Sequence, residues 1–595
     1  MVEPTPDAAK VLQFGSIDDE SYELQDKDKE SGLRGDPILE FRFGDLSSSN
    51  LELHFGDDWT RQRSRSRAIS QSRSSRPVSS IYQDQFPTGI KLVLILASMV
   101  LVQFVLMLDL SIIATAIPSI TNEFNSLLDV GWYGSSYQLA SASLQPMTGK
   151  IYSNFKSKWA FFLFFFIFEL GSLLCAVAQS SVMLIVARAI AGVGSAGLLT
   201  GGLTIVSACL PKQRQPAMLG IMIAIGQLGQ ASGPLIGGAF TEFVSWRWCF
   251  YINLPIGGLI AGFLFFVHIP DRVEKPDKAK ILSTFASTMD LDGFGLFAPA
   301  AVQLLLALQY GGNQYAWNSA TVIGLLAGGA GTFALFFYWE YRKGKSAMVP
   351  LYLLRQRTVW SSCATMFFNI GVTNIISYYL PIYFQAVEDA SPITSGVDLL
   401  PNILVQIAFA MVSGLTVQRF GYYWPWVVIG PTASAIAFGL MSTVRPGTAS
   451  ANRIGYQVLA GFGMGAGTTM PFVVVQNLVP LAQTPTAMAI LLFCQNFGGA
   501  CFLTFASTVF NQSLPKAIAT YAPAANVAEI LATGATAFRH VVNSTDLPGV
   551  IMAYSVSISY VWYLVCGAAG GALMTGLFMG YRDIRKTGND PAPAP

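Results

Sequence analysis

The feature that most constrains this chain is a succession of fourteen apolar segments, each about twenty residues long, between residues 92 and 580. A helix needs about twenty residues to cross the hydrocarbon core of a bilayer. Of the 595 residues, 52% are hydrophobic and 12% are charged, roughly half the charged fraction of a soluble domain. The sequence therefore predicts an all-α, polytopic membrane protein, and it excludes a soluble enzyme, a secreted disulfide-rich domain and a nucleic-acid-binding protein.

The fourteen predicted transmembrane helices fall into three groups. The first six are at 92–118, 128–148, 159–178, 181–207, 216–239 and 248–268. Two more follow at 293–310 and 320–340. The last six are at 360–385, 394–416, 421–441, 454–478, 486–509 and 552–580.

These groups define the expected domain organisation. Residues 1–88 are polar and include an Arg/Ser-rich stretch, so we expect them to form a disordered cytosolic tail. The remaining regions are an N-terminal six-helix bundle (89–270), a linker with two inserted helices (271–345), a C-terminal six-helix bundle (346–582) containing a long outer loop (510–551), and a second cytosolic tail (583–595).

Charge and glycosylation signals predict the orientation. With the N-terminus in the cytosol, the short inner loops hold fifteen Lys and Arg residues and the outer connections hold five, as the positive-inside rule requires. An even number of helices returns the C-terminus to the cytosol. The two N-x-S/T sequons, at Asn511 and Asn543, both fall in the predicted outer loop, so we expect a glycan there.

A weak internal repeat relates the two bundles. The segment Ala191–Gly194 recurs as Ala460–Gly463 at an offset of 269 residues, and the same offset pairs Arg188 with Gln457. The segment 149–155 matches 414–420 at an offset of 265 residues. Parallel similarity between two halves is typical of transporters whose substrate site lies between them near the middle of the membrane.

Several motifs resemble those of the major facilitator superfamily. They are MLDLSIIATAIPSI (107–120), RAIAGVGSAG (188–197) and GQLGQASGPLIGG (226–238), in the family's order and on the matching helices. The run SWRWCFYINLPIGG (245–258) is similar to the fourteen-helix drug:proton antiporters, especially fungal toxin and multidrug efflux pumps. The resemblance covers residues 90–585 and implies two six-helix bundles and export of a small molecule in exchange for protons. Ser153 replaces an aspartate of the family's inner-loop motif, which puts a salt-bridge latch there in doubt.

Three ionisable residues lie inside predicted helices. Asp109 and Arg188 stand at a similar depth on the first and fourth helices and have opposite charges. A charge at that depth is costly, so it should face a partner or a cavity. The resemblance gives the arginine a part in proton coupling, whereas a static packing pair is the alternative. Glu169 is a third candidate for proton coupling, although a protonated, locally hydrogen-bonded glutamate is the simpler interpretation.

The fifth helix carries glycines four residues apart, which form a smooth face that lets another helix approach closely. Pro234 lies among them and loosens the helix locally. The resemblance marks this segment as the antiporter motif that shapes the gate, with close packing alone as the alternative. Its candidate residues are Gly226, Gly229, Gly233, Pro234, Gly237 and Gly238.

Candidate substrate contacts are polar or aromatic residues within otherwise apolar helices, where few charges suit an amphipathic, largely neutral ligand. For any one of them, a hydrogen bond between helices is an equally good explanation. They are Tyr137, Gln138, Gln227, Gln230, Asn369, Asn374, Tyr378, Gln406, Gln495 and Asn496.

These observations favour a proton-coupled antiporter that exports a secondary metabolite, toxin or drug. Proton-linked uptake, for example of a siderophore, and a non-transporting sensor remain as alternatives. Only three histidines are present and no nucleotide-binding loop occurs, so we expect no enzymatic activity, metal or cofactor. We expect a monomer in the plasma membrane, with the vacuolar membrane as the alternative, and a small-molecule substrate, protons and the lipid bilayer as its partners.

Overall fold

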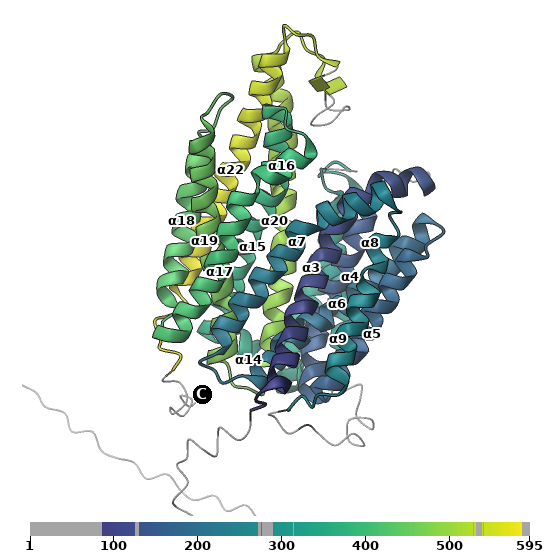
Figure 1. The fold of residues 1–595 in the computed structure, drawn as a ribbon, viewed down its shortest axis with the longest axis vertical. Coiled ribbons are helices and arrows are strands. Elements are labelled where there is room, and N and C mark those ends of the chain that lie inside the picture. Colours follow the sequence, from purple (N-terminus) through teal and green to yellow (C-terminus); the bar gives the residue numbers. More distant parts are fainter. Residues whose placement is uncertain are drawn as a thin grey trace, which may run out of the picture. The chain divides into compact units, whose positions relative to one another are not determined.

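The computed structural model describes residues 86–585 apart from 125–129, 272–274, 276–288, 313–314, 528, 531–537 and 540. The expected tails, 1–88 and 583–595, lie almost wholly outside the described residues. The described chain is built from long helices that form two neighbouring bundles (Figure 1).

The first bundle has six membrane helices, the sixth of which is divided by one residue into α8 and α9. The helices are α3 (Ile90–Phe124), α4 (Val130–Asn154), α5 (Ser157–Ala176), α6 (Ser181–Cys209), α7 (Gln215–Phe243), α8 (Trp248–Tyr251) and α9 (Asn253–Phe265).

The inserted pair and the second bundle follow in the expected order. The inserted helices are α12 (Leu291–Tyr310) and α13 (Ala320–Lys343). The short helix α14 (Leu351–Leu354) leads to α15 (Arg357–Glu388), α16 (Pro392–Asp398), α17 (Leu400–Phe420), α18 (Trp424–Met441), α19 (Ser450–Leu478), α20 (Thr484–Tyr521) and α22 (Leu547–Leu577).

Within the described residues, thirteen helical segments are long and apolar enough to cross a membrane, and α4 is the fourteenth predicted helix. Two of its polar side chains, Gln145 and Thr148, face the neighbouring helix α6. Gln145 donates hydrogen bonds to Thr200 and to the carbonyl of Ala196, and Thr148 lies 2.7 Å from Thr200. Buried polar groups need such partners inside a membrane, so the polarity of α4 reflects helix packing. The fourteen-helix prediction is confirmed.

The predicted outer connection at 510–551 is partly helical in the structure. Helix α20 continues to Tyr521 and α22 already begins at Leu547, so both ends of that segment are helical. Leu514 and Ile518 are buried there against the C-terminal bundle, which explains why the helix extends beyond the length that a bilayer requires. Asn511 therefore lies on a helix, whereas Asn543 is exposed between helices.

The repeat inferred from glycines recurs in the packing. A Cβ added to Gly192 of α6 would collide with the carbonyl oxygen of Tyr137 on α4. In the second bundle, a Cβ on Gly461 of α19 would collide with the carbonyl oxygen of Asn402 on α17. Both crossings need glycine because the two backbones touch. The same contact is thus built twice, once in each half.

The two halves meet through a second duplicated contact. Gly149 of α4 packs against the backbone of Pro485 and Thr486, where α20 begins. Gly414 of α17 packs in the same way against the backbone of Pro216, where α7 begins. These helix ends lie on the side that the charge distribution assigns to the cytosol, so the halves are in close backbone contact on that side.

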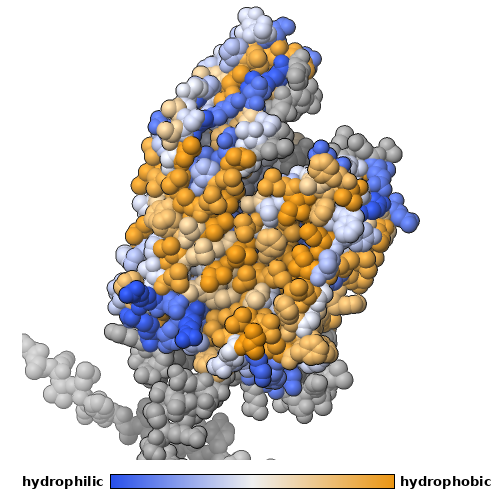
Figure 2. Space-filling model, viewed as in Figure 1, coloured by the Kyte–Doolittle hydropathy of each residue, from blue (hydrophilic) through white to orange (hydrophobic). Residues whose placement is uncertain are grey.

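The inserted helices cover one of the two seams between the halves. Helix α12 contacts α4 through Trp132 and Tyr310, whose ring centroids lie 6.1 Å apart, and α20 through Phe297 and Phe493, at 5.0 Å. The surface is apolar over the middle of the helices, and polar residues gather near their ends (Figure 2). Exposed side chains such as Phe166 and Leu163 belong to that apolar surface, as expected for helices facing lipid.

Candidate functional site

The centre of the N-terminal bundle contains a buried ion pair. Arg188 of α6 donates from Nη1 to Oδ2 of Asp109 on α3 at 2.7 Å, and both side chains are at most 1% exposed. Removing two charges from water costs several kcal/mol for each ion, so the pair persists only with good geometry and further hydrogen bonds. Asp109 and Arg188, which the sequence places at a similar depth with opposite charges, are in direct contact in the structure.

Helices α4 and α8 complete the surroundings of Arg188. Its Nε donates to the backbone carbonyl of Tyr133 at 3.1 Å. The ring of Tyr137 lies 4.4 Å from the guanidinium carbon, and the ring of Phe250 lies 5.9 Å away. Aromatic faces attract a cation, most strongly where water is absent. Tyr137, predicted as a substrate contact, therefore belongs to this ion-pair site.

Asn253, at the start of α9, is a site residue that the sequence did not single out. It is fully buried and donates from Nδ2 to Oδ1 of Asp109 at 3.0 Å and to Ser172 of α5 at 3.1 Å. Asn253 lies inside the helix predicted at 248–268, and it meets the same criterion as the candidate substrate contacts, a polar residue within an otherwise apolar helix. The segment NLPIGG contributed only to the family resemblance, so no signal in the chain tied this amide to Asp109.

Glu169 lies close to this cluster but does not join the ion pair. It stands one helical turn before Ser172 on α5 and packs against Gly257, one turn after Asn253 on α9. Both carboxyl oxygens are buried and have no hydrogen-bond partner among the described residues. Buried carboxyl groups without partners favour the protonated, uncharged form. A coupling role for Glu169 stays a prediction.

The glycines of α7 pack against the helix that carries Asp109. A Cβ on Gly229 would lie 2.5 Å from the carbonyl oxygen of Phe104, and one on Gly233 would overlap Ser111. A Cβ on Gly237 would lie 2.6 Å from the carbonyl oxygen of Ile112. The smooth face predicted from the spacing is therefore pressed directly against α3.

The other residues of the predicted antiporter motif on α7 differ in their surroundings. A Cβ on Gly226 would meet Gln103 and Met107 at 3.1 and 3.2 Å, whereas Gly238 has no atom within 4 Å of such a Cβ. Pro234 is exposed within an otherwise continuous α7. Gly238 thus takes no part in the close packing.

The other predicted substrate contacts are spread over both bundles. Asn369 donates to the carbonyl of Gly467 at 3.3 Å, and Gln406 is buried where α17 crosses α19, so both serve helix packing. Gln138 and Tyr378 are exposed. The partly exposed members of the set are Gln227, Gln230, Asn374, Gln495 and Asn496. Which of them touches substrate stays a prediction.

A buried cluster fixes the inserted helices next to the end of α4. Asp290, in a left-handed conformation just before α12, accepts hydrogen bonds from Lys343, Trp339 and the backbone of Met348 at 2.8 to 3.0 Å. Burial raises the pKa of Asp290, but these donors outweigh it and hold the pKa below its ordinary value. Lys150 of α4 donates to the carbonyl of Ser346 at 2.7 Å.

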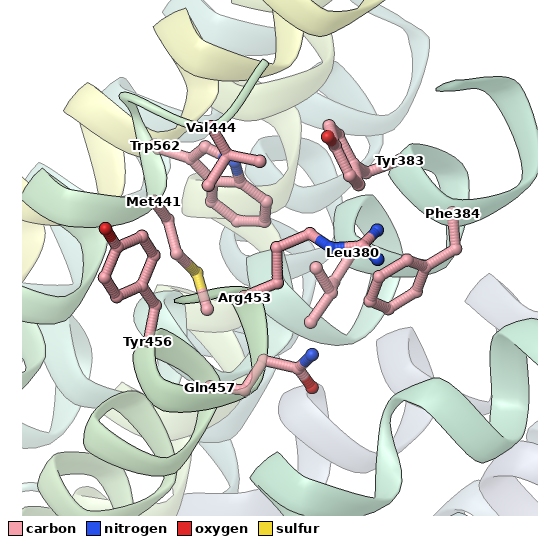
Figure 3. A pocket seen from close by; sticks show the side chains of 9 residues that line it. All are labelled: Leu380, Tyr383, Phe384, Met441, Val444, Arg453, Tyr456, Gln457 and Trp562. Carbon is pink, nitrogen blue, oxygen red and sulfur yellow. The ribbon is translucent and has the colours of Figure 1, made fainter. Parts of the chain in front are cut away.

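The second bundle contains a small pocket at the level of Gln457, the counterpart of Arg188 (Figure 3). Its volume is about 20 Å³, room for about one water molecule. Arg453 enters it from α19 and pairs with Glu388. Tyr383 and Trp562 line it as well. The pocket is too small for an organic substrate, and no group of three His, Cys, Asp or Glu side chains among the described residues could hold a metal.

Comparisons with known proteins match this architecture. The Major Facilitator Superfamily model matches residues 99–503. The chain is 52% identical over 504 residues to the MFS-type transporter pigP of Monascus ruber, with 85% of this chain and 88% of the relative covered. The chain belongs to the major facilitator superfamily. It is therefore a multi-pass membrane transporter and not an enzyme.

Further comparisons support this assignment. The transporter is 46% identical over 521 residues to the efflux pump mlcE of Penicillium citrinum, with 86% of this chain and 94% of the relative covered. Among solved structures, it resembles the proton:xylose symporter XylE with a TM-score of 0.52 at 16% identity, covering 82% of this chain and 96% of the other. At that identity the structural likeness shows the fold alone.

Proposed function

We propose that this transporter is a proton-coupled antiporter that exports a small organic compound, such as a secondary metabolite, toxin or drug. The observation that carries the proposal is the buried Asp109–Arg188 pair, because an ionisable carboxylate deep in a membrane bundle is a natural proton-binding group. The relatives named efflux pumps support the direction of transport. We further propose a monomer with both termini in the cytosol, located in the plasma membrane.

The contacts suggest how a proton could affect the seam between the halves. A proton on Asp109 removes its charge and most of its attraction for Arg188. Asp109 lies on α3, which packs on the glycine face of α7, and the start of α7 packs on Gly414 of α17. A shift of α3 after protonation is therefore transmitted through α7 to the contact between the halves.

Accumulation in living cells tests this proposal. Pump-deficient yeast expressing the chain would be loaded with a panel of amphipathic toxins, with and without a protonophore. We expect at least one compound to accumulate less in expressing cells, and we expect the protonophore to abolish the difference. Greater accumulation would mean proton-linked uptake instead, and export that resists the protonophore would contradict proton coupling.

Two variants make the test specific to the site. Arg188→Ala removes the cation of the pair, and Gln457→Ala changes the equivalent position of the other half. At matched surface abundance, we expect Arg188→Ala to lose export at least about tenfold, because Asp109 is then left without its counter-charge, and Gln457→Ala to retain most of it. Equal loss in both variants would mean that the ion pair has no special role.

A further inference from the structure

Asn253 connects the ion pair to two further helices of the bundle. Its Nδ2 group bonds both Asp109 of α3 and Ser172 of α5, while its own backbone belongs to α9. Its Oδ1 atom is buried and has no hydrogen-bond partner among the described residues. An amide with two engaged donor bonds and an unused acceptor beside a carboxylate is incompletely satisfied, which calls for a physical reason.

The chemistry of the Asn253 amide gives a physical reason for its unused acceptor. Charged Asp109 accepts hydrogen bonds only, and it takes them from Arg188 and Asn253. Protonated Asp109 carries an O–H that needs an acceptor, which a guanidinium cannot provide. Rotation of the Asn253 amide about its last side-chain bond places Oδ1 where Nδ2 now lies, so one side chain can serve both forms of the carboxyl group.

We propose that Asn253 is a positioning residue for proton exchange at Asp109. It donates to the charged carboxylate and, after its amide rotates, accepts the hydrogen bond of the neutral acid. This inference rests on the proposed function, in which Asp109 takes up and releases the coupled proton. Asn253 exchanges no proton itself, since an amide does not titrate.

The other ionisable groups near Asp109 do not serve this purpose. Those that interact with it electrostatically are Arg188 on α6, Tyr137 on α4, Cys175 and Glu169 on α5, and Cys249 on α8. Among the described residues, only Arg188 and Asn253 donate hydrogen bonds to the carboxylate. Of these two, only Asn253 can also accept one.

The test uses the purified full chain and the proton as its ligand, so no transported compound is needed. Infrared spectroscopy follows the C=O stretch of protonated carboxyl groups as the pH is varied, and the signal lost in Asp109→Asn identifies Asp109. We expect Asn253→Ala to move the midpoint of that signal to higher pH by about one unit, because the charge-assisted hydrogen bond that the charged form loses is stronger than the neutral one that the protonated form loses.

Three further variants separate positioning from packing. Asn253→Leu fills the volume without polar atoms and should shift the midpoint as alanine does. Asn253→Ser keeps a donor and an acceptor and should bring the midpoint back toward the wild-type value. Ser172→Ala leaves the bond to Asp109 intact and should shift the midpoint less than Asn253→Ala does.

Distinct results would overturn the proposal. An Asp109 midpoint that stays in place in both Asn253→Ala and Asn253→Leu shows that the amide only packs. Failure of serine to restore the midpoint, or no Asp109 signal at all, rejects the positioning role as well. If the wild-type chain exports no compound in cells while the Asn253 variants shift the Asp109 midpoint as expected, the antiport proposal is rejected and the positioning of Asp109 by Asn253 stands.

Discussion

The two bundles share a backbone plan but differ in their charges. Each has a glycine crossing, Gly192 on Tyr137 in the first and Gly461 on Asn402 in the second, with the two backbones in the same contact. At the position of Arg188 the second bundle has Gln457, which is 2% exposed. The repeat thus preserves helix packing, whereas among the residues that the structure describes the buried Asp–Arg pair occurs in the first half only.

The partner of that pair is also missing from the second bundle. Gly229 packs on Phe104 and its counterpart Gly498 packs on Phe367. Five residues after these phenylalanines stand Asp109 and Val372, respectively, and Val372 is 2% exposed. An apolar residue can be buried without cost, whereas a carboxylate needs its charge compensated. The first half therefore carries a demanding site on a helix arrangement that the second half builds without one.

The largest expected effect tests the difference in buried charge between the two bundles. Arg188→Ala leaves Asp109 buried and unpaired, so we expect a loss of about 3–5 kcal/mol in the free energy of unfolding, against about 1 kcal/mol or less for Gln457→Ala. Thermal unfolding of the purified variants in detergent measures both. The double variant Arg188→Ala/Asp109→Ala should recover most of the loss, and no recovery would show that the arginine acts through packing alone.

A smaller effect should be the same in both halves. Gly192→Ala and Gly461→Ala each place a methyl group on a neighbouring carbonyl oxygen, which forces the helices apart and costs about 1–3 kcal/mol. The same unfolding measurement should give similar losses for the two variants. A large difference between them would contradict the view that packing is repeated while charge is not.

The smallest effect concerns a charge that belongs to neither repeat. The folded-state pKa of Asp290 lies below its ordinary value. Its carboxylate therefore stabilises the fold fully at a pH above that ordinary pKa, and this contribution disappears as the pH falls through the folded-state pKa. Asp290→Asn should cost about 1–2 kcal/mol at pH 7.

Unfolding midpoints measured from neutral pH down to about pH 3 would check the prediction for Asp290. We expect the difference between the wild type and Asp290→Asn to shrink as the pH falls. A constant difference would assign the effect to shape instead of charge.

Much of the fold and part of the site followed from sequence patterns. The length of each apolar run predicted the helices, and the opposite charges of Asp109 and Arg188 at similar depth predicted their contact. The glycine spacing on α7 predicted a smooth face but not its partner, which is α3. Asn253 was missed although it is a polar residue inside the helix predicted at 248–268, because nothing in the local sequence distinguishes a partner of Asp109 from any other buried amide.

By itself, the sequence determined that this protein crosses a membrane with fourteen helices in two related halves and belongs to a transporter family. These properties depend on quantities read along the chain: apolar length, charge between helices and motif order. Only the tertiary structure decided which groups surround the buried carboxylate of Asp109, because Asp109, Arg188, Asn253 and its partner Ser172 lie on four different helices. Hydrogen bonds depend on where helices cross within a few ångströms, and hydropathy along the chain carries no information on that scale.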